Sequence, residues 1–523
     1  MAARWDSLDL LDIVARNALD PTRVALSLGG DELTYTQLVN RATTLARALR
    51  VRCGLQRGDR VALLCRNRLE YFEVELGVTR AGGILVAMSW RYSAEECISV
   101  LRRSGARIAI VDAEFEGVLN DARNAGKLPA LQVLVAFAPA AAADLEYDEL
   151  VVAPPGAGEA IPLAGRTLDD PHEIIFTSGT TGTPKGAVWT NGGVIWNALQ
   201  QILDFGIDRD SVTFVAFDLN YIGGRHQFVW GVLHRGGIVH IKESGGFDAG
   251  RVLAAIERNR VSHILLVPTM LHDLLATPEL SMTDTSSLRT IMTGGAAVST
   301  ELLAAARAAL PGVHIMQVYG LTEGGGTVSY APASLPDIKG GSAGHASTHA
   351  SIRIVDDSGS VLGPDAIGEI QLQAPTVCAG YWDDSDATSQ LFDADWLRTG
   401  DLGLLDAEGY LFITGRKKDL IISGGMNIFP IEIEAVLERH PHVRAAAVFG
   451  MPHERWGESV CAAVELKPGY TVSAKELTAL CRESLASYKK PTRIEFLTAL
   501  PRTSSGKISK GDLPTMFGSG LPA

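Results

Sequence analysis

The chain has 523 residues, of which 46% are hydrophobic and 20% are charged. At roughly 100–200 residues per domain this length predicts two or more domains, and the composition excludes long-range disorder, collagen and coiled coil as the main architecture. Lys and Arg number 47 against 60 Asp and Glu, which gives a net charge of −13. The chain as a whole therefore has no attraction for nucleic acid or anionic lipid.

The sequence offers no window of about 18 uninterrupted apolar residues, so we expect no membrane span. The first eleven residues carry Arg4, Asp6 and Asp9 and lack the apolar core of a signal peptide. The six cysteines are scattered without a C-x-x-C pair, which argues against a structural zinc site or a disulfide framework. We therefore expect a protein of the reducing cytoplasm.

Apolar runs alternate with helix-like stretches from residue 59 to residue 317. In the stretch after Ser93, Glu96 stands at the third position, which is the pattern of a helix capping box. Short apolar runs between helices indicate a mostly parallel sheet covered on both faces. The Ala-, Pro- and Gly-rich stretch 139–165 is predicted to be a surface loop. The predicted elements are strands over 60–64, 107–111, 212–216, 237–241, 264–267, 290–292 and 313–318, and helices over 69–81 and 93–104.

The pattern changes after about residue 340. Short strands predicted over 351–355, 368–373 and 410–413 are separated by Asp-Ser-Gly, Gly-Pro and Glu-Gly turns, which is typical of a small antiparallel sheet or barrel. A final block has a pattern of its own, with a helix over 430–439 that has Pro near its start and a strand over 445–449. We therefore expect an α/β fold. Its large N-terminal part has mixed and parallel sheets covered by helices plus a β-barrel-like subdomain, and a smaller α+β part follows.

The segment with the clearest chemistry is 176–186, Phe-Thr-Ser-Gly-Thr-Thr-Gly-Thr-Pro-Lys-Gly, which holds three glycines, five hydroxyl side chains and one lysine. Glycines let backbone N–H groups approach an anion, hydroxyls donate further hydrogen bonds, and Lys185 supplies charge. The segment follows an apolar run and precedes a predicted helix, so we interpret it as a phosphate-binding loop and not as a flexible linker. No G-K-[S/T] follows at the Walker spacing.

This segment resembles the phosphate loop of the adenylate-forming superfamily, which includes acyl-CoA synthetases, the adenylation domains of peptide synthetases and luciferases. Further stretches resemble family motifs in the family's order, so that the resemblance covers nearly the whole chain. These stretches are Tyr319-Gly320-Leu321-Thr322-Glu323, Arg398-Thr399-Gly400-Asp401, Gly415-Arg416-Lys417-Lys418-Asp419, Ser423-Gly424-Gly425-Met426-Asn427-Ile428 and Pro501-Arg502-Thr503-Ser504-Ser505-Gly506-Lys507.

The resemblance implies a role for each motif in holding the nucleotide. It implies that Tyr319 stacks on adenine, that Thr322 touches phosphate, that Glu323 binds Mg²⁺, and that Asp401 and Arg416 reach the ribose. The whole ATP/AMP site implied in this way is Thr177, Ser178, Gly179, Thr180, Thr181, Gly182, Lys185, Gly295, Ala296, Tyr319, Gly320, Thr322, Asp401 and Arg416.

The implied catalytic residues are Lys507, Thr322 and Glu323. A carboxylate that attacks the α-phosphate of ATP is an anion meeting an anion, so cations must neutralise the charge that develops at phosphorus and on the leaving pyrophosphate. Mg²⁺ on Glu323 supplies part of this charge, and Lys507, in a Ser/Gly-rich loop, supplies the rest. The competing interpretation of both residues is a solvated surface charge.

The family's hinge falls at Lys418, which predicts an N-terminal AMP-binding domain over 1–417 and a mobile C-terminal catalytic domain over 418–523. The resemblance implies that Ser423, Gly424 and Gly425 line the pantetheine tunnel. Lys507 and this loop both need the same carboxyl group, one for adenylation and one for thiol attack, so we expect the domain to swing between half-reactions. Lys489 is a candidate contact for the phosphates of coenzyme A.

The predicted activity is that of an ATP-dependent acyl-CoA synthetase. It joins a carboxylic acid to AMP with release of pyrophosphate and passes the acyl group to the thiol of coenzyme A, using ATP and Mg²⁺. A ligase that loads a carrier protein is the alternative. Coenzyme A is favoured, because the chain ends at Ala523 without an appended carrier domain and its tunnel loop looks intact. No nucleic-acid partner is expected, and the sequence leaves monomer and homodimer open.

Two other activities have one feature each. Ser342 lies in a G-x-S-x-G pattern, but a hydrolase nucleophile needs an apolar strand before it and a helix after it, and this sequence provides neither. His345 and His349 are four residues apart, yet no acidic partner is arranged as on a metalloprotease helix. Both readings are disfavoured, as is a binding module without catalysis, because Lys507 is present.

The acid itself is the open question. Many acyl-CoA synthetases carry a His where this chain has Tyr221. The glycines around the expected acyl pocket favour a roomy site for a bulky, fatty or aryl acid, although turns and close approach to adenine explain them equally well. Arg225 is the exceptional nearby cation, facing solvent or paired with an acid. The pocket candidates are Tyr221, Gly294, Gly295, Gly320, Gly325 and Val328, with Phe228 and Trp230 as further apolar neighbours.

Overall fold

The computed structural model describes residues 9–518 apart from 138, 140, 153–165, 178–183, 297, 333–338 and 503–507. The chain divides into two compact units. The first comprises Met1–Pro336, Gly344–Ser351 and Leu372–Leu397, and the second comprises Asp337–Ala343, Ile352–Gln371 and Arg398–Ala523. The predicted division at 417/418 concerns which part moves during the reaction, and it stays a prediction.

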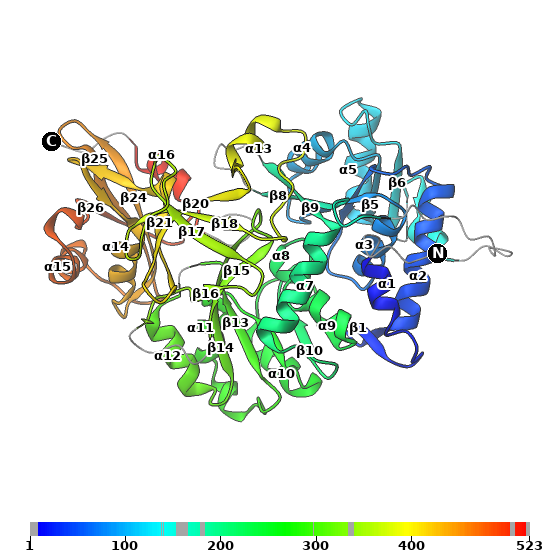
Figure 1. Cartoon of the computed structure of the whole chain (residues 1–523), viewed down its shortest axis with the longest axis horizontal. Helices are drawn as coiled ribbons and strands as arrows, with labels where there is room; N and C mark the ends of the chain where they lie inside the picture. The colour runs from blue at the N-terminus through cyan, green and yellow to red at the C-terminus, as the bar shows by residue number, and fades with distance from the viewer. Residues whose placement is uncertain are drawn as a thin grey trace. The chain divides into compact units, whose positions relative to one another are not determined.

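A seven-stranded sheet forms one half of the first unit, in the order β7-β6-β5-β3-β4-β8-β9. Figure 1 labels β5, β6, β8 and β9 of this sheet. All neighbours pair in parallel except β8 and β9, which pair antiparallel. Val61 and Leu63 face one hydrophobic cluster while Ala62 and Leu64 face another, so both faces are covered, as the continuous apolar runs predict. The strands are β3 (Arg60–Leu64), β4 (Ile84–Met88), β5 (Ile108–Asp112), β6 (Val133–Phe137), β7 (Leu145–Glu146), β8 (Pro171–Thr177) and β9 (Lys185–Thr190).

A nine-stranded sheet forms the other half, in the order β16-β15-β14-β13-β12-β10-β11-β1-β2. The pairs from β1 through β14 are parallel, and the edge pairs β1–β2, β14–β15 and β15–β16 are antiparallel. The strands are β1 (Val24–Leu28), β2 (Asp31–Thr34), β10 (Val212–Val215), β11 (Ile238–Ile241), β12 (His263–Leu265), β13 (Thr290–Gly294), β14 (His314–Leu321), β15 (Gly326–Ala331) and β16 (His345–Ala346).

Helices arrange these sheets into five layers. The largest hydrophobic cluster takes side chains from both sheets and from α2, α3, α7 and α9, so these helices lie between the sheets. Helices α4 and α5 cover the outer face of the seven-stranded sheet, and α10, α11 and α12 cover that of the nine-stranded one. Burying each large aliphatic side chain in such layers contributes about 1.5–3 kcal/mol.

The two helices predicted over 69–81 and 93–104 are present as α3 (Glu70–Arg80) and α4 (Ala94–Ser104). In α4, Ser93 Oγ accepts the backbone N–H of Glu96 and the Glu96 carboxylate accepts that of Ser93, so the predicted capping box is present. The helices are α1 (Leu10–Ala15), α2 (Tyr35–Val51), α3 (Glu70–Arg80), α4 (Ala94–Ser104), α5 (Ala113–Asn124), α6 (Tyr147–Val151), α7 (Asn191–Phe205), α8 (Ile222–Arg225), α9 (Val229–Arg235), α10 (Ala249–Asn259), α11 (Pro268–Ala276), α12 (Thr300–Ala309) and α13 (Ser385–Leu391), with a 3-10 helix over Pro278–Met282.

The predicted loop over 139–165 was wrong in part. Leu145–Glu146 forms β7, and Tyr147–Val151 forms α6. Tyr147 is fully buried, and its hydroxyl donates to Glu73 Oε2 over 2.8 Å. Burying an aromatic ring outweighs the loop-forming composition around it.

Two sheets organise the second unit. The first, most of whose residues lie in this unit, has the order β17-β18-β20-β19 with β21 paired to β20, while β19 belongs to the first unit. Its strands are β17 (Ser351–Val355), β18 (Gly368–Gln373), β19 (Phe392–Asp393), β20 (Trp396–Leu405) and β21 (Leu411–Arg416). It is the small sheet that the short strands after residue 340 predicted, and β21 extends to Arg416.

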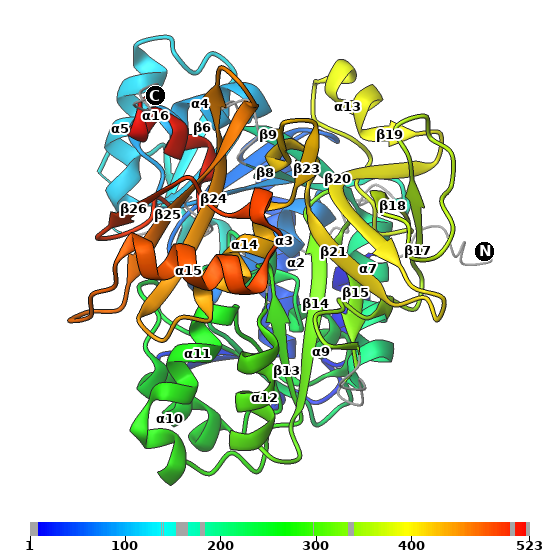
Figure 2. The ribbon, with the colours of Figure 1, turned by 90° about the vertical axis from the view of Figure 1, so that its left-hand side faces the viewer.

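The second sheet of this unit has the order β23-β22-β25-β24 with β26 paired to β25. Helices α14 and α15 share a hydrophobic cluster on one face of β24 and β25, and α16 packs on the other face (Figure 2). The elements are β22 (Ile421–Ser423), β23 (Met426–Ile428), α14 (Pro430–Glu438), β24 (Val443–His453), β25 (Gly457–Leu466), α15 (Ala474–Ser484), β26 (Arg493–Leu497) and α16 (Leu513–Phe517), with 3-10 helices over Lys417–Asp419, Ser487–Lys489 and Lys510–Asp512.

Sheet order and layering confirm the predicted α/β fold class, with one large part of parallel and mixed sheets and one smaller α+β part. Among the described helices, none has both the length and the apolar surface to cross a membrane.

Candidate active site

The predicted phosphate loop connects two neighbouring antiparallel strands, β8 and β9, and we call these two strands the phosphate hairpin. Thr177 ends β8 and lies directly opposite Lys185, the first residue of β9, and the Thr177 hydroxyl donates to the Lys185 carbonyl at 3.5 Å. Pairing of the two strands holds both ends of the loop at one edge of the sheet, where exposed N–H groups of a loop can meet an anion. Ser178, Gly179, Thr180, Thr181 and Gly182 lie outside the described residues.

Glu323 lies near the end of this hairpin and is held by a tyrosine. The Tyr381 hydroxyl donates to Glu323 Oε1 over 2.9 Å, and Lys185 Nζ lies 5.1 Å from the centre of the Tyr381 ring. Burial and the neighbouring Glu323 carboxylate raise the pKa of Tyr381, so its phenol stays a neutral donor. Tyr381 was not predicted from the sequence. It comes 58 residues after Glu323, and only the fold brings the two together.

The turn that carries Thr322 and Glu323 is fastened from two sides. The indole N–H of Trp189, in β9, donates to the Thr322 carbonyl over 2.9 Å. The side-chain amide of Asn197, in α7, donates to the Gly325 carbonyl over 2.7 Å. The predicted metal-binding motif therefore has a fixed backbone relative to the strand that follows the predicted phosphate loop.

Tyr319 and Gly320 lie in β14, where it pairs with β15. A Cβ on Gly320 would stand 1.8 Å from the Gly326 carbonyl oxygen, and a Cβ on Gly294 would stand 2.3 Å from that of Val318. Both glycines are therefore needed for close packing of neighbouring strands.

Gly325 has a similar explanation. Its φ is +82°, and an added Cβ would lie 2.2 Å from the Thr376 carbonyl oxygen. Only Gly295 of the four predicted pocket glycines faces open space, since its nearest neighbour would be Val267 at 3.9 Å; it is exposed, as is Ala296. The expectation that glycine density leaves a roomy pocket is thus not supported at Gly294, Gly320 or Gly325, and their membership of an acyl pocket stays a prediction.

The other residues named for the acyl pocket divide into two groups. Tyr221 is half-buried at the start of α8. Phe228 and Trp230 are fully buried, and each packs edge-on against a core phenylalanine, so they belong to the hydrophobic core. Val328 is also buried, in β15.

Arg225 does not face solvent; it pairs with acids in a fully buried ion cluster. Its guanidinium contacts Glu75 at 3.2 Å and donates to Glu173. His172 lies 3.1 Å from Glu75, and His226 lies 2.5 Å from Glu173. All five side chains have no solvent exposure. The cluster joins α3, β8 and α8, and therefore ties the strand before the phosphate loop to the helix that follows Tyr221.

The Arg225 guanidinium is the cation that faces both carboxylates of this cluster. Burial lowers the pKa of His226 to about 3, with a further contribution from Arg225. Burial alone would raise the pKa of Glu75, but Arg225 and His172 outweigh it and the pKa lies below its ordinary value. Glu75, Glu173 and His226 bring their ligand atoms within 4.8 Å of one another, the spacing of a metal site. The Arg225 guanidinium already occupies both carboxylates, so a metal ion would be repelled there.

In the second unit the two predicted ribose residues meet across paired strands. Asp401 in β20 lies opposite Arg416 in β21, and Arg416 Nε is 3.3 Å from Asp401 Oδ1. The Asp401 backbone N–H donates to Thr399 Oγ1 over 3.1 Å, and this hydrogen bond holds the backbone of Asp401 in place. Asp401 is buried while Arg416 is exposed.

The predicted hinge and the predicted tunnel loop come directly after β21 in the sequence. Lys418 lies in the 3-10 helix between β21 and β22. Ser423 ends β22, and Gly424 and Gly425 form its turn into β23 with φ of +58° and +79°, which glycine adopts at no steric cost. Both roles stay predictions.

Lys489 is engaged by a neighbour in the same unit. Its ammonium group forms an ion pair with Glu432 of α14, which would have to open before Lys489 could hold a phosphate of coenzyme A. Lys507 lies outside the described residues, and its catalytic role stays a prediction.

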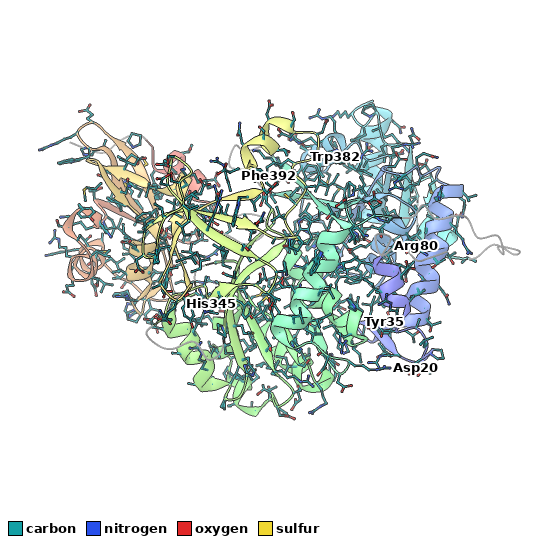
Figure 3. All side chains as sticks on the ribbon, in the orientation of Figure 1. Asp20, Tyr35, Arg80, His345, Trp382 and Phe392 are labelled. Carbon is teal, nitrogen blue, oxygen red and sulfur yellow. The ribbon has the colours of Figure 1, made fainter. Side chains whose placement is uncertain are left out.

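The described residues do not support the hydrolase alternative at Ser342 or the metal alternative at His345 and His349. Ser342 is fully buried, and its hydroxyl donates to the Leu411 carbonyl over 2.9 Å, so it is not presented on an exposed turn as a nucleophile. His345 lies in the short strand β16, and His349 packs near Trp196. Figure 3 labels His345 among the side chains.

The chain resembles known proteins over nearly its whole length. Residues 14–382 match the family model for AMP-binding enzymes, and residues 432–507 match the model for the AMP-binding enzyme C-terminal domain. The chain is 36% identical to a feruloyl-CoA synthase of Amycolatopsis sp over 97% of the chain and 98% of that protein. It is 35% identical to indoleacetate–CoA ligase of Aromatoleum aromaticum over 97% and 98%. It is 34% identical to a fatty acid–[acyl-carrier-protein] ligase of Streptomyces coeruleorubidus over 95% and 94%.

Solved structures are similar over the same length. The amide bond synthetase of Marinactinospora thermotolerans superposes with a TM-score of 0.86 at 30% identity, covering 97% of this chain and 99% of that one. The o-succinylbenzoate CoA synthetase of Bacillus subtilis, in complex with its acyl-adenylate intermediate, gives 0.82 at 31% identity, covering 96% and 97%. The resemblance to the adenylate-forming superfamily is thereby confirmed: the chain belongs to the AMP-binding enzyme family.

Proposed function

We propose that the protein is an ATP-dependent acid:CoA ligase for aromatic or other bulky apolar carboxylic acids. In the first half-reaction the carboxylate attacks the α-phosphorus of ATP, forming acyl-AMP and releasing pyrophosphate. In the second, the thiol of coenzyme A attacks the acyl carbon, AMP leaves, and the thiol proton is released.

The observation that carries the proposal is the corner formed by Lys185, Glu323 and Tyr381 beside the phosphate hairpin. A lysine and a carboxylate fixed next to a glycine- and hydroxyl-rich loop are the groups that a nucleoside triphosphate with its metal ion requires. Lys185 neutralises phosphate charge directly, and preorganised groups of this kind stabilise the charge that develops in phosphoryl transfer.

The donor set at this corner fits Mg²⁺, which prefers oxygen ligands from one or two carboxylates together with phosphate oxygens. Glu323 supplies the carboxylate, and the Thr322 hydroxyl is the neighbouring oxygen. When bound, the ion would offset negative charge on the phosphates. Glu323 is partly exposed, and its carboxylate accepts a hydrogen bond from the neutral Tyr381 phenol, so its charge stays available to a cation.

Two features bear on the acid and its acceptor. The similar proteins include ligases named for feruloyl-CoA and indoleacetate, whose acids are aromatic, and we extend that class to this chain. The glycine turn at Gly424 and Gly425 supports coenzyme A as acceptor. A carrier protein is the second candidate, because the fatty acid–[acyl-carrier-protein] ligase is nearly as similar. We also propose a cytoplasmic location, which agrees with six buried cysteines that remain free thiols.

Pyrophosphate release across a panel of acids tests the proposal. The panel holds ferulate, indole-3-acetate, 2-succinylbenzoate, octanoate and acetate, each with coenzyme A, with an acyl carrier protein and with neither. We expect ATP-dependent release with one or more aromatic acids, and thioester formation with coenzyme A by mass spectrometry. Preference for acetate would refute the substrate class, and thioester on the carrier protein alone would make it the acceptor. No release with any acid would count against the activity.

A further inference from the structure

A short segment between β18 and α13 runs beside β9 and extends the edge of the seven-stranded sheet. The backbone N–H of Ala379 donates to the Val188 carbonyl over 2.8 Å, and that of Val188 donates to the Gly380 carbonyl over 2.9 Å. Ala187 and Tyr381 form an isolated antiparallel bridge. Tyr381 therefore has a fixed backbone position relative to the strand that begins with Lys185.

The next residue strengthens this attachment. The Trp382 backbone N–H donates to the Gly186 carbonyl over 2.7 Å, and the Tyr381 N–H donates to Thr388 Oγ1 over 2.9 Å. Trp382 is labelled in Figure 3, and its side chain packs against the hydrophobic cluster that includes α4. The side chain of Tyr381 thus projects from a backbone held on both sides.

The same segment also holds the turn that carries Glu323. The Cys378 N–H donates to the Glu323 carbonyl over 2.9 Å, and Thr376 Oγ1 donates to the Gly324 carbonyl over 3.0 Å. Residues 376–382, which we call the brace, therefore contact both the phosphate hairpin and the metal-binding motif. These two parts of the sequence are otherwise more than a hundred residues apart.

Within the brace, Tyr381 is the residue whose side chain reaches the candidate metal ligand. Its hydroxyl donates to Glu323 Oε1 at 2.9 Å, a normal hydrogen-bond length. Lys185 Nζ stands 5.1 Å from the ring centre, within the range of a cation–π contact. One side chain thus contacts both the cation and the carboxylate of the corner.

We propose that Tyr381 is a positioning residue that fixes the Glu323 carboxylate for Mg²⁺, and so sets the metal affinity of the nucleotide site. This inference rests on the proposed function. A glutamate side chain rotates freely unless a partner holds it, and partners that hydrogen-bond to metal ligands typically change metal affinity or activity 10–100-fold when removed. A phenol suits the task, because it orients the carboxylate without neutralising it, as an arginine would.

Two single substitutions separate this role from simple packing. Tyr381→Phe removes the hydroxyl and keeps the ring beneath Lys185, whereas Tyr381→Leu removes both. Tyr330→Phe is the matched control, because the Tyr330 hydroxyl faces the Asp204 carboxylate elsewhere in the same unit. If the ring alone matters, Tyr381→Phe behaves like the wild type and Tyr381→Leu does not.

The experiment measures metal binding apart from turnover. Mn²⁺ serves as the paramagnetic probe, and its binding to the full-length protein in the presence of α,β-methylene-ATP is followed by electron paramagnetic resonance. We expect Tyr381→Phe to raise the Kd for Mn²⁺ about 10-fold or more, and Tyr330→Phe to leave it within twofold. Pyrophosphate release should need correspondingly more Mg²⁺ in Tyr381→Phe and should recover at high Mg²⁺.

Each outcome decides the matter. Wild-type Mn²⁺ affinity and Mg²⁺ dependence in Tyr381→Phe would overturn the inference while leaving the proposed function intact. Failure of the wild type to bind Mn²⁺ with the nucleotide would overturn both. Should Tyr381→Phe not fold, Glu323→Asp withdraws the carboxylate from the phenol by one methylene. It should then show the same weakened Mn²⁺ binding, and normal binding in that variant would refute the positioning role.

Discussion

Two groups of charged residues in the first unit illustrate opposite uses of a carboxylate. In the buried ion cluster, Glu75 and Glu173 have no solvent exposure, and the Arg225 guanidinium contacts both. At the corner of Lys185, Glu323 and Tyr381, for which we propose metal binding, Glu323 is partly exposed and its carboxylate accepts a hydrogen bond from the neutral Tyr381 hydroxyl. In the first group a buried protein cation contacts the carboxylates. In the second a neutral hydroxyl orients the carboxylate, and we propose that its charge is kept for a ligand.

This contrast separates a charged cluster that stabilises the fold from one that can bind a ligand. Both groups include a residue of the phosphate hairpin. Glu173 of the ion cluster lies in β8, and Lys185, which accompanies Glu323 and Tyr381, begins β9. Spacing alone would favour the buried group as a metal centre, because its donor atoms converge within 4.8 Å. The presence of a buried guanidinium excludes that role, so the charge of the partners is more informative than their geometry.

The largest effect is expected from breaking the buried cluster. Arg225→Met leaves two buried carboxylates without their cation, and removal of one partner of a buried ion pair costs about 3–5 kcal/mol. Urea unfolding followed by tryptophan fluorescence measures the loss. Adding Glu75→Gln and Glu173→Gln to Arg225→Met removes the uncompensated charge and should recover a large part of it. A single variant within about 1 kcal/mol of wild type would show that the cluster is not a buried ion network.

Glu323→Gln sharpens the contrast from the other side. The amide keeps the shape of the side chain and loses the charge that would hold Mg²⁺. We expect adenylation to fall about 10²–10³-fold, as on loss of one electrostatic group, while the free energy of unfolding changes by no more than about 0.5 kcal/mol. ATP–pyrophosphate exchange and urea unfolding measure the two quantities. A large stability loss with normal exchange would make Glu323 a structural residue.

The pH dependence of stability should report the cluster. The pKa of His226 is about 3 in the folded chain because of burial, and burial also lowers that of His172. An unfolded histidine titrates near pH 6.5, so between about pH 6.5 and 3 the unfolded chain binds more protons and stability falls as pH falls. The loss from His226 alone amounts to about 2 kcal/mol by pH 5. The lowered pKa of Glu75 adds a further loss at lower pH.

His226→Gln is the control for this titration, because glutamine is polar and does not ionise in this range. Its unfolding free energy, measured by urea titration from pH 8 to 4.5, should depend less steeply on pH than that of the wild type. Identical slopes would assign the pH dependence to other groups.

Much of the fold was predictable because local patterns specify it. The strands around 60–64 and 108–112 are continuous apolar runs, and the capping box at Ser93 and Glu96 is present as predicted. The motif residues Asp401 and Arg416 were expected at the same sugar, and they meet across β20 and β21. Such features depend on neighbours in the chain or on motifs whose order is readable.

The remainder depends on contacts between distant segments, which no local pattern encodes. Tyr381 meets Glu323 only because residues 376–382 pair with β9. Arg225 was expected either to face solvent or to pair with an acid. It pairs with two buried acids because α3 and β8 pack around α8, which the sequence alone does not reveal. Gly320 suggested room for a substrate, whereas the approach of β15 occupies that space.

The smallest effect is expected in the second unit, where an exposed arginine and a buried carboxylate form a mixed case. Arg416 contacts Asp401 at 3.3 Å and is half exposed, so Arg416→Lys should change the unfolding free energy by no more than about 0.5 kcal/mol. Lysine keeps the charge but loses the planar fork, and loss of one hydrogen bond of about 1 kcal/mol corresponds to a rise of about fivefold in the KM for ATP. Because the ribose takes no part in bond making, kcat should stay within about twofold. Initial rates of pyrophosphate release at varied ATP measure both constants.

Asp401→Asn, which weakens the acceptor at the buried end of the same pair, should raise the KM for ATP further. An unchanged KM in both variants would place this pair outside the nucleotide site, and a fall in kcat alone would place it nearer the reacting phosphate than the ribose.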